Sequence, residues 1–241
     1  MKASLPAVFF LLVAVCASAD EHRLDSANID PQDAISLQRG ARTFVNYCLN
    51  CHSANAMRYN RLMDLGLTEQ QIKDNLLFTT EKIGDAMSIS ANRKDQKEWF
   101  GVEPPDLSVI ARSRSIDWLY TYLRTFYRDE KRSTGWNNLT FPNVAMPHAL
   151  WQLQGIQTVK TEIEEHGGHK SEHRQLVLET PGSMSSLEYD NLTRDLVNFL
   201  SYMAEPEKLK RSQIGILVLL FLLLLLVPAW LLKKEYWKDV H

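Results

Sequence analysis

A long uncharged run near the carboxyl end constrains the fold of this chain more than any other feature. Residues 214–232 read IGILVLLFLLLLLVPAWLL, which is 19 residues without a charge. As a helix this run would be roughly 28 Å long, close to the hydrocarbon thickness of a bilayer. A core helix of a soluble protein would keep a polar face, and this run has none. The sequence therefore predicts one membrane-spanning helix, with Trp230, Tyr236 and Trp237 suited to an interfacial belt.

The amino end has the pattern of an export signal. Lys2 is followed by the apolar stretch AVFFLLVAVCA and then by small residues up to Ala19, after which we expect cleavage. Retention of this segment as an anchor is the alternative. A lipoprotein signal at Cys16 is disfavoured because Val15 before it is bulky.

An export signal and one later span divide the chain into four parts. We expect a signal peptide at 1–19, an exported domain at 20–208, an anchor helix at 209–232 and a cytoplasmic tail at 233–241. Basic residues flank both ends of the span, so the positive-inside rule alone is ambiguous. The export signal decides the orientation.

Composition limits the functions open to the exported domain. The chain has 27 basic and 29 acidic residues, a net charge of −2 and no basic stripe, so we expect no nucleic-acid partner. Once the signal is removed, Cys48 and Cys51 are the only cysteines in the sequence. A disulfide between them would close a very short loop and add little stability. The domain is therefore not built on disulfides.

The two cysteines belong to a C-x-x-C-H motif formed by Cys48, Cys51 and His52. Such a motif fits a zinc site, a redox dithiol or a covalently attached haem. Zinc needs about four ligands, and the sequence has no further cysteine to complete the site. Distant histidines in the stretch EEHGGHKSEH are interpreted as part of a solvated loop; they are His166, His169 and His173.

The residues before the motif argue against a redox dithiol. A thioredoxin-type pair follows a strand and begins a helix. Here Leu37, Ala41 and Phe44 have helical spacing, with Asp30 as the expected cap and Pro31 in the first turn. The motif is therefore expected to end a helix. An exported oxidoreductase that uses the dithiol stays as the weaker alternative.

Covalent haem explains both the spacing and the histidine. Two thiols can add across the two vinyl groups of the porphyrin, and the two-residue gap allows one tight turn to reach both. The histidine that follows then lies under the iron as an axial ligand. The sequence predicts one covalently bound haem c, held by Cys48, Cys51 and His52.

The second axial ligand would decide the role of the haem, because methionine raises the potential and favours electron transfer. The candidates are Met57, Met63, Met87, Met146, Met184, Met203 and His148. Met203 follows a helical apolar pattern and is expected in the core, and Met87 lies in a polar stretch that we expect to be flexible. Met146 lies between two prolines that stiffen its loop. Spacing alone favours Met146, and leaves open both His148 and Met184 at the start of the domain's last helix.

Several segments in a fixed order resemble the cytochrome c1 family, the haem subunits of the ubiquinol–cytochrome c oxidoreductase, or bc1 complex. They follow the haem motif and read EPPDLSVIARSR, FPNVAMPHAL and FLSYMAEPEKLKR, before the single C-terminal span. The resemblance covers roughly residues 34–238. It implies a mainly α fold, with a cytochrome c-like haem domain, long loops and one C-terminal transmembrane helix. A small β excursion is expected at 155–180, where RQLVLET has the pattern of a strand.

The resemblance also implies roles for particular residues. Met146 matches the sixth ligand of the family. Pro105 would lie next to the ring on the His52 side. Arg114 would lie near a haem propionate, with Trp118 beside it. From the residues alone, Trp118 is equally explained as helix core, and Arg114 as a surface ion pair.

As a function, the resemblance implies an electron carrier that makes and breaks no substrate bond itself. A Rieske iron–sulfur subunit would reduce it, a soluble or membrane-anchored cytochrome c would accept its electron, and cytochrome b would be the other partner. Residues 66–98 lack a long acidic insert, which suits a bacterial inner membrane with the haem domain in the periplasm. A free-standing membrane-anchored c-type cytochrome, or the haem subunit of a terminal oxidase, is the alternative.

Overall fold

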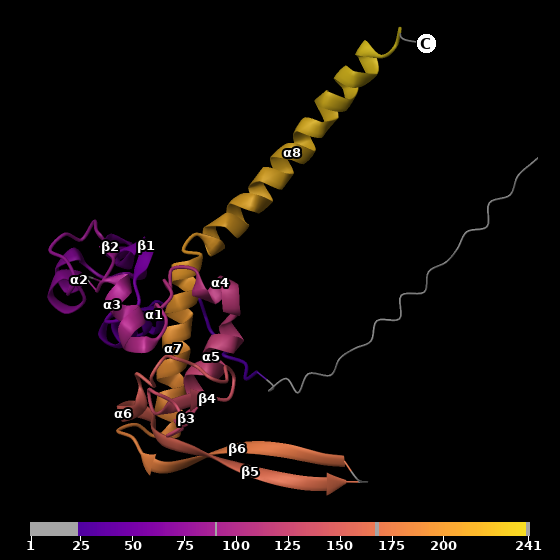
Figure 1. Ribbon diagram of the computed structural model, residues 1–241. Coiled ribbons are helices and arrows are strands. Elements are labelled where there is room, and N and C mark those ends of the chain that lie inside the picture. The colour runs from indigo at the N-terminus through magenta and orange to yellow at the C-terminus, as the bar shows by residue number, and fades with distance from the viewer. Residues whose placement is uncertain (1–23, 90, 167–168, 240–241) are drawn as a thin grey trace, which may run out of the picture.

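The chain forms a mostly helical head followed by one long helix (Figure 1). The computed structural model describes residues 24–89, 91–166 and 169–239, and it describes no side chains at 163–173, 209 and 212–213. The expected signal peptide at 1–19 lies outside the described residues. Within them, the prediction of a mainly α fold is confirmed.

Helix α7 (Ser186–Ala204) is the central element of the head. Helix α1 (Ala34–Thr43) packs against one side of α7, and α4 (Ile110–Arg114) and α5 (Ile116–Arg124) pack against the other (Figure 1). Buried side chains of α7 fill the space between these helices; they include Leu196, Val197, Phe199, Leu200 and Met203. The expected core position of Met203 is confirmed.

The shorter elements surround this helical core. The helical ones are η1 (Phe44–Cys48), η2 (Tyr59–Leu65), α2 (Glu69–Asn75), α3 (Arg93–Phe100) and α6 (Trp151–Gln154). The antiparallel strand pairs are β1 (Ala54–Arg58) with β2 (Ala86–Met87), and β3 (Phe126–Arg128) with β4 (Trp136–Asn138). Long loops connect most of these elements, as expected for this fold class.

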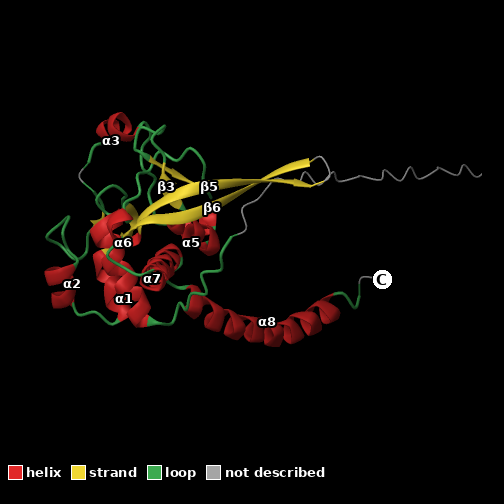
Figure 2. Cartoon of the chain, turned by 90° about the horizontal axis from the view of Figure 1, so that it is seen from below, coloured by secondary structure: helices red, strands yellow, loops and turns green. Residues whose placement is uncertain are grey.

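The excursion expected at 155–180 is a long antiparallel hairpin. Its strands are β5 (Gly155–His166) and β6 (His169–Pro181), which extend away from the head (Figure 2). The strands are longer than the sequence indicated, so the stretch that we expected to be a histidine-rich loop lies largely within them. The side chains of His166, His169 and His173 lie outside the described part.

Helix α8 (Lys208–Tyr236) follows α7 after a short break. Its segment Ile214–Tyr236 is long and apolar enough to cross a membrane, and none of its most apolar window is buried against the described protein. The helix extends beyond the expected limits of 209–232 at both ends. Because α7 has 19 residues, about 28 Å at 1.5 Å per residue, the hairpin before it and the anchor after it lie at opposite ends of the head (Figure 1).

Two local expectations were wrong. Helix α1 begins three residues later than expected: Asp33 accepts hydrogen bonds from the amides of Ile35 and Ser36, while Asp30 forms the turn before it. Both are aspartates that can cap a helix, and only the path of the chain decides between them. Met87 lies in strand β2 and is fully buried, so its surroundings are not a flexible stretch.

The crossing of α1 and α7 is very close at Gly40. A Cβ atom added at Gly40 would clash with the backbone oxygen of Asp195 and would lie 2.7 Å from Cβ of Phe199. Arg39 strengthens the same contact, because its Nε donates to the Asp195 carboxylate at 2.5 Å. Glycine at residue 40 therefore allows the two helices to pack without displacement.

We expect Gly40→Ala to destabilise the head by about 1–3 kcal/mol, because backbone atoms cannot move aside for the added methyl group. In a helix without such a close neighbour, replacing glycine by alanine would raise the free energy of unfolding. A decrease in the free energy of unfolding therefore indicates the close contact between the helices. Denaturant unfolding of the detergent-solubilised chain, followed by circular dichroism, measures it. Gly84→Ala is the matched control, because a Cβ there meets nothing within 4 Å. Equal stability of the two variants would contradict the close crossing.

Candidate functional site

The C-x-x-C-H motif forms a tight turn directly after α1 and η1. The amides of Cys51 and His52 both donate to the carbonyl of Cys48, at 3.1 and 2.9 Å. The expectation that the motif ends a helix is therefore confirmed. The two thiols are free rather than joined in a disulfide. Burial raises the pKa of Cys48 to about 12 and also raises the pKa of Cys51, the opposite of the lowered pKa that a reactive dithiol needs.

His52 is buried and its ring has a defined orientation. Its Nδ1 donates to the carbonyl of Pro105 at 2.8 Å, which places the proton on Nδ1 and leaves the lone pair of Nε2 free. Burial lowers the pKa of His52, with the Pro105 carbonyl and Asp106 acting in the opposite direction. The result is a neutral imidazole with one open nitrogen, which is the form that binds a metal.

The segment after Pro105 is tied to the chain that follows the motif. Leu107 donates its amide to the carbonyl of Ser53 at 2.9 Å. Asp106 accepts from the amide of Asn55 at 2.8 Å and from the amide of Ser108 at 2.8 Å. These bonds hold the Pro105 carbonyl beside the His52 ring. The resemblance placed Pro105 on this side, and the structure adds that its backbone oxygen makes the contact.

Gln96 is a residue of the site that the sequence did not reveal. It lies on α3 and is almost completely buried, and its Nε2 donates to the carbonyl of Cys51 at 2.9 Å. The other residues of α3 from Arg93 to Trp99 are exposed, so nothing in the local pattern distinguishes Gln96 from its polar neighbours. Only a buried polar side chain with a specific partner identifies it.

Met146 is the methionine with the most distinctive surroundings. Its side chain is half-buried on the loop between β4 and α6, and its Sδ accepts a hydrogen bond from the Tyr122 hydroxyl at 3.3 Å. Among the other candidates, Met57, Met87 and Met203 are packed in the core, whereas Met63 is 49 % exposed. Met184 is half-buried immediately before α7 rather than in its first turn.

Tyr189 of α7 connects the motif to the helix that contacts Met146. Its hydroxyl donates to the carbonyl of Leu123 at 2.8 Å, one residue after Tyr122. Burial raises the pKa of Tyr189, and the nearby Cys48 adds to this effect. Segments about 75 residues apart in the sequence, those of Cys48 and Leu123, therefore meet around one tyrosine.

His148 is packed as a core residue. Its ring stacks on Phe126 at 4.8 Å between centroids and meets the edge of Trp136 at 5.2 Å. Burial lowers the pKa of His148 to about 4, and Gln154 opposes this shift. Enclosure between aromatic rings gives His148 a packing role and makes it a weaker ligand candidate than Met146.

Arg114 and Trp118 lie beside the Tyr122 contact. The exposed guanidinium of Arg114 lies over the rings of Trp118, at 5.1 Å, and Phe141, at 5.5 Å. It forms no ion pair with a described residue. Trp118 is only half-buried and stacks on Tyr122 at 4.9 Å. The structure thus brings Arg114, Trp118 and Met146 together around Tyr122.

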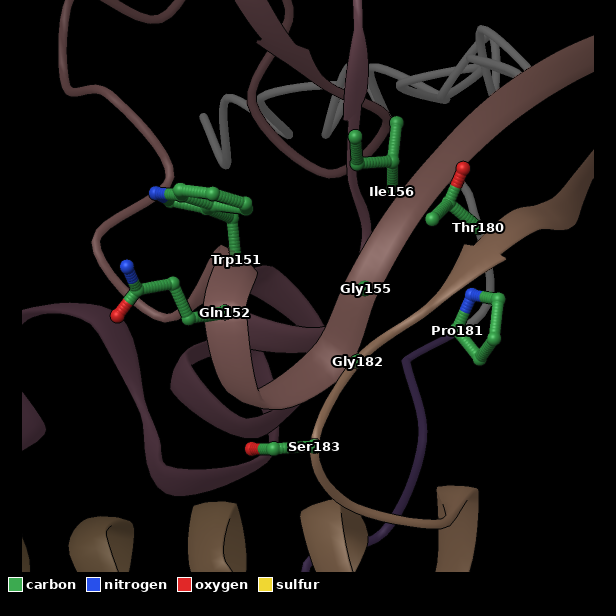
Figure 3. A pocket seen from close by; sticks show the side chains of 8 residues that line it. All are labelled: Trp151, Gln152, Gly155, Ile156, Thr180, Pro181, Gly182 and Ser183. Atoms are coloured by element: carbon green, nitrogen blue, oxygen red, sulfur yellow. The ribbon is translucent and has the colours of Figure 1, made fainter.

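A hollow elsewhere in the described part of the chain is less suited to the predicted cofactor. A hollow of about 200 Å³ lies at the base of the hairpin, lined by residues such as Trp151, Gly155 and Gly182 (Figure 3). It contains none of the predicted site residues and is smaller than the roughly 300–1,000 Å³ of usual ligand pockets. No three His, Cys, Asp or Glu side chains gather as a metal site in the described ranges.

Comparison with known proteins agrees with this geometry. The model of the cytochrome c1 family matches residues 26–175 and 180–240. The chain belongs to the cytochrome c1 family. It is 49 % identical to a cytochrome c1 of Allochromatium vinosum over the full length of both chains. It is 50 % identical to a protein named ammonia monooxygenase gamma subunit in Nitrosomonas europaea, covering 96 % of this chain and 98 % of that one. A cytochrome c1 of Rhodospirillum rubrum is 26 % identical, over 86 % of this chain and 83 % of its own.

Membership in the cytochrome c1 family makes this chain an electron carrier with a membrane anchor helix, and it implies a covalent haem c. The residues present fit such a group. Two unbonded thiols lie in one turn before a neutral histidine with a free Nε2, and a hydrogen-bonded methionine sulfur lies on a separate loop. The roles of the individual residues remain predictions from the sequence and the geometry.

We expect Asp106→Ala to lower the free energy of unfolding at pH 7 by about 1 kcal/mol, because the amides of Asn55 and Ser108 lose a charged acceptor that is partly screened by solvent. Burial would raise the pKa of Asp106, but hydrogen bonds from Ser108 and Asn55 outweigh it and hold the pKa below its ordinary value. The contribution is therefore present above the unfolded pKa of about 3.9 and is lost as the pH falls through the folded pKa.

Unfolding by denaturant at pH 7 and at acid pH checks this prediction. The difference between the wild type and Asp106→Ala should shrink as the pH falls below about 4. Glu98→Ala, at an exposed position on α3, is the control for loss of a surface carboxylate. A difference that is independent of pH would contradict the proposed ionised acceptor.

Proposed function

We propose that this chain is the haem subunit of a quinol–cytochrome c reductase. In this role it takes single electrons from a Rieske iron–sulfur subunit and passes them to a soluble or membrane-anchored cytochrome c. The observation that carries the proposal is the fixed tautomer of His52, whose Nδ1–H is bonded to the Pro105 carbonyl and whose Nε2 is free. Cytochrome b and the iron–sulfur protein would come from other chains, and this chain would make or break no substrate bond.

Different site residues would attach the cofactor covalently and ligate its iron. Cys48 and Cys51 would form the two thioether bonds, and His52 and Met146 would be the axial ligands. A haem bound in this way supplies a one-electron centre, whose potential methionine ligation and burial raise. The protein keeps both ligands in place before any electron arrives, because the Pro105 carbonyl orients His52 and a side-chain hydroxyl holds the methionine sulfur.

Arg114, Trp118 and Pro105 would lie around the edge of the cofactor. A propionate carries a negative charge that needs a cation or a donor when it is sheltered from water. Arg114 has a guanidinium that two aromatic rings hold in position and that no described carboxylate neutralises. It is therefore the side chain best suited to a propionate, with Trp118 as the surface on which it rests.

The membrane anchor would hold the haem at a fixed height above the quinol site. At the junction of head and anchor, Arg61 binds Glu207 at 2.7 Å and Asp64 at 3.0 Å. Arg211, in the first turn of α8, binds Glu205 at 3.1 Å. In the proposed topology the signal 1–19 is removed, the domain 20–208 is periplasmic, the anchor begins near residue 209 and the tail after residue 232 is cytoplasmic in a bacterial inner membrane.

The relative from Nitrosomonas europaea raises a second candidate, because its name assigns it to ammonia monooxygenase. It covers almost the whole chain at the same level of identity as the cytochrome c1 of Allochromatium vinosum. A role as an electron carrier fits either assembly. We favour the quinol–cytochrome c reductase because the matching family model is that of cytochrome c1 and the relatives from Allochromatium vinosum and Rhodospirillum rubrum are both named cytochrome c1.

Isolation of the complex from native membranes tests the proposal. We expect the chain to co-purify with a cytochrome b and an iron–sulfur protein, and its haem to be reduced within seconds after addition of a quinol. A specific inhibitor of quinol oxidation serves as the control. Purification of the chain alone would instead indicate a free-standing cytochrome, and ammonia-dependent activity of the purified assembly would favour the second candidate.

We expect Met146→Leu to abolish the weak methionine–iron absorption at the red end of the spectrum and to lower the midpoint potential sharply, because leucine cannot ligate iron. Met184→Leu tests the alternative ligand, and Met63→Leu is the control because Met63 is 49 % exposed. A reduced-minus-oxidised spectrum with a potential titration measures all three variants. If the band disappears in Met184→Leu and persists in Met146→Leu, the ligand assignment is wrong.

A further inference from the structure

We propose that Tyr122 is a positioning residue that orients and tunes the methionine ligand. Its hydroxyl donates a hydrogen bond to Sδ of Met146, and this bond raises the midpoint potential of the bound haem. The inference rests on the proposed role of Met146 as the sixth ligand. Tyr122 is not among the site residues that the sequence predicted.

The ring of Tyr122 packs against two other aromatic rings, so the hydroxyl has a fixed position. Trp118 stacks on it with centroids 4.9 Å apart and planes at 9°. Phe126 meets it edge-on at 5.0 Å and 66°. Such aromatic pairs stabilise a defined ring orientation. Rotation of the O–H bond is then the main freedom left to the donor.

The loop that carries the acceptor is tied to the same scaffold. Buried Asn138 donates from Nδ2 to the carbonyl of Tyr122 at 2.7 Å, and its Oδ1 accepts from the amide of Phe141 at 3.0 Å. Asn137 accepts from the amide of Asn143 at 2.8 Å. Two adjacent asparagines therefore bond both to the backbone of Tyr122 and to the loop that leads to Met146. These hydrogen bonds fix the distance between the Tyr122 hydroxyl and the Met146 sulfur.

The hydrogen bond has a chemical consequence for the ligand. A thioether sulfur has two lone pairs, and a donor on one of them leaves the other available for the metal. The donor withdraws electron density from the sulfur, which favours the reduced form of the centre over the oxidised form, because the oxidised form carries one more positive charge. The tyrosine keeps its proton throughout, so one electron moves and no proton is exchanged.

The hydrogen bonds would therefore change the electron-donor strength of the two proposed ligands in opposite directions. His52 donates to the Pro105 carbonyl, which makes its free nitrogen a stronger ligand. Met146 accepts from Tyr122, which makes its sulfur a weaker electron donor. A high potential suits an electron carrier that must accept electrons from a donor whose own reduction potential is high, such as a Rieske centre, while its ligand set stays intact.

Tyr122→Phe in the full-length haem-loaded chain tests the inference. We expect the methionine–iron band to remain and the redox equilibrium constant to shift two- to tenfold toward the oxidised form, a fall of about 20–60 mV for one electron. Tyr120→Phe is the matched control, because Tyr120 lies on the same helix and packs against Arg124. A potential unchanged in Tyr122→Phe, or lowered equally in both variants, would overturn the proposal.

A second variant keeps the test informative if loss of the hydroxyl disturbs folding. Replacement of Tyr122 by 3-fluorotyrosine keeps the ring and makes the hydroxyl a stronger donor, so the potential should rise. A fall or no change would overturn the proposal. Met146→Leu distinguishes failure of the ligand assignment from failure of the tuning role. If Met146→Leu keeps the methionine–iron band, the ligand assignment is wrong. If Met146→Leu loses the band while both Tyr122 variants have the potential of the wild type, only the tuning role is wrong.

Discussion

The close packing of α1 on α7 is the contact on which the rest of the site depends. Gly40 permits it, and the bond between Arg39 and Asp195 strengthens it. Because α1 leads directly into the C-x-x-C-H turn, the crossing brings Cys48 close enough to Tyr189 of α7 for an electrostatic interaction. Tyr189 in turn binds the carboxyl end of α5, the helix that contacts Met146. A shift of α1 would therefore move His52 relative to Met146, the two side chains that we propose as axial ligands.

Hydrogen bonds to backbone groups then refine this placement. The carbonyl of Pro105 selects the tautomer of His52, and Gln96 holds the carbonyl of Cys51. Asn138 fixes Tyr122 and the start of the loop that carries Met146. Rigid surroundings suit electron transfer, because a ligand set that does not rearrange has little to reorganise when the charge changes.

Much of the architecture follows from patterns that are local in the sequence. The uncharged run predicts the long C-terminal helix because a bilayer requires its backbone to bond internally. The strand pattern of RQLVLET within the segment 155–180 predicts the β excursion, although not the full length of the hairpin. The cap of α1 and the burial of Met87 were missed, because equivalent local residues were available and tertiary packing selected among them.

By itself, the sequence determined the chemistry of the site: two thiols and a histidine at the spacing of covalent haem attachment, and an anchor helix at the far end. It also suggested Met146, although spacing alone left other ligands open. Only the tertiary structure decided which atoms orient these groups, because the Pro105 carbonyl, the Gln96 amide and the Tyr122 hydroxyl belong to residue types that are common everywhere in proteins. Their importance comes from burial and from partners distant in the sequence, which no local pattern encodes.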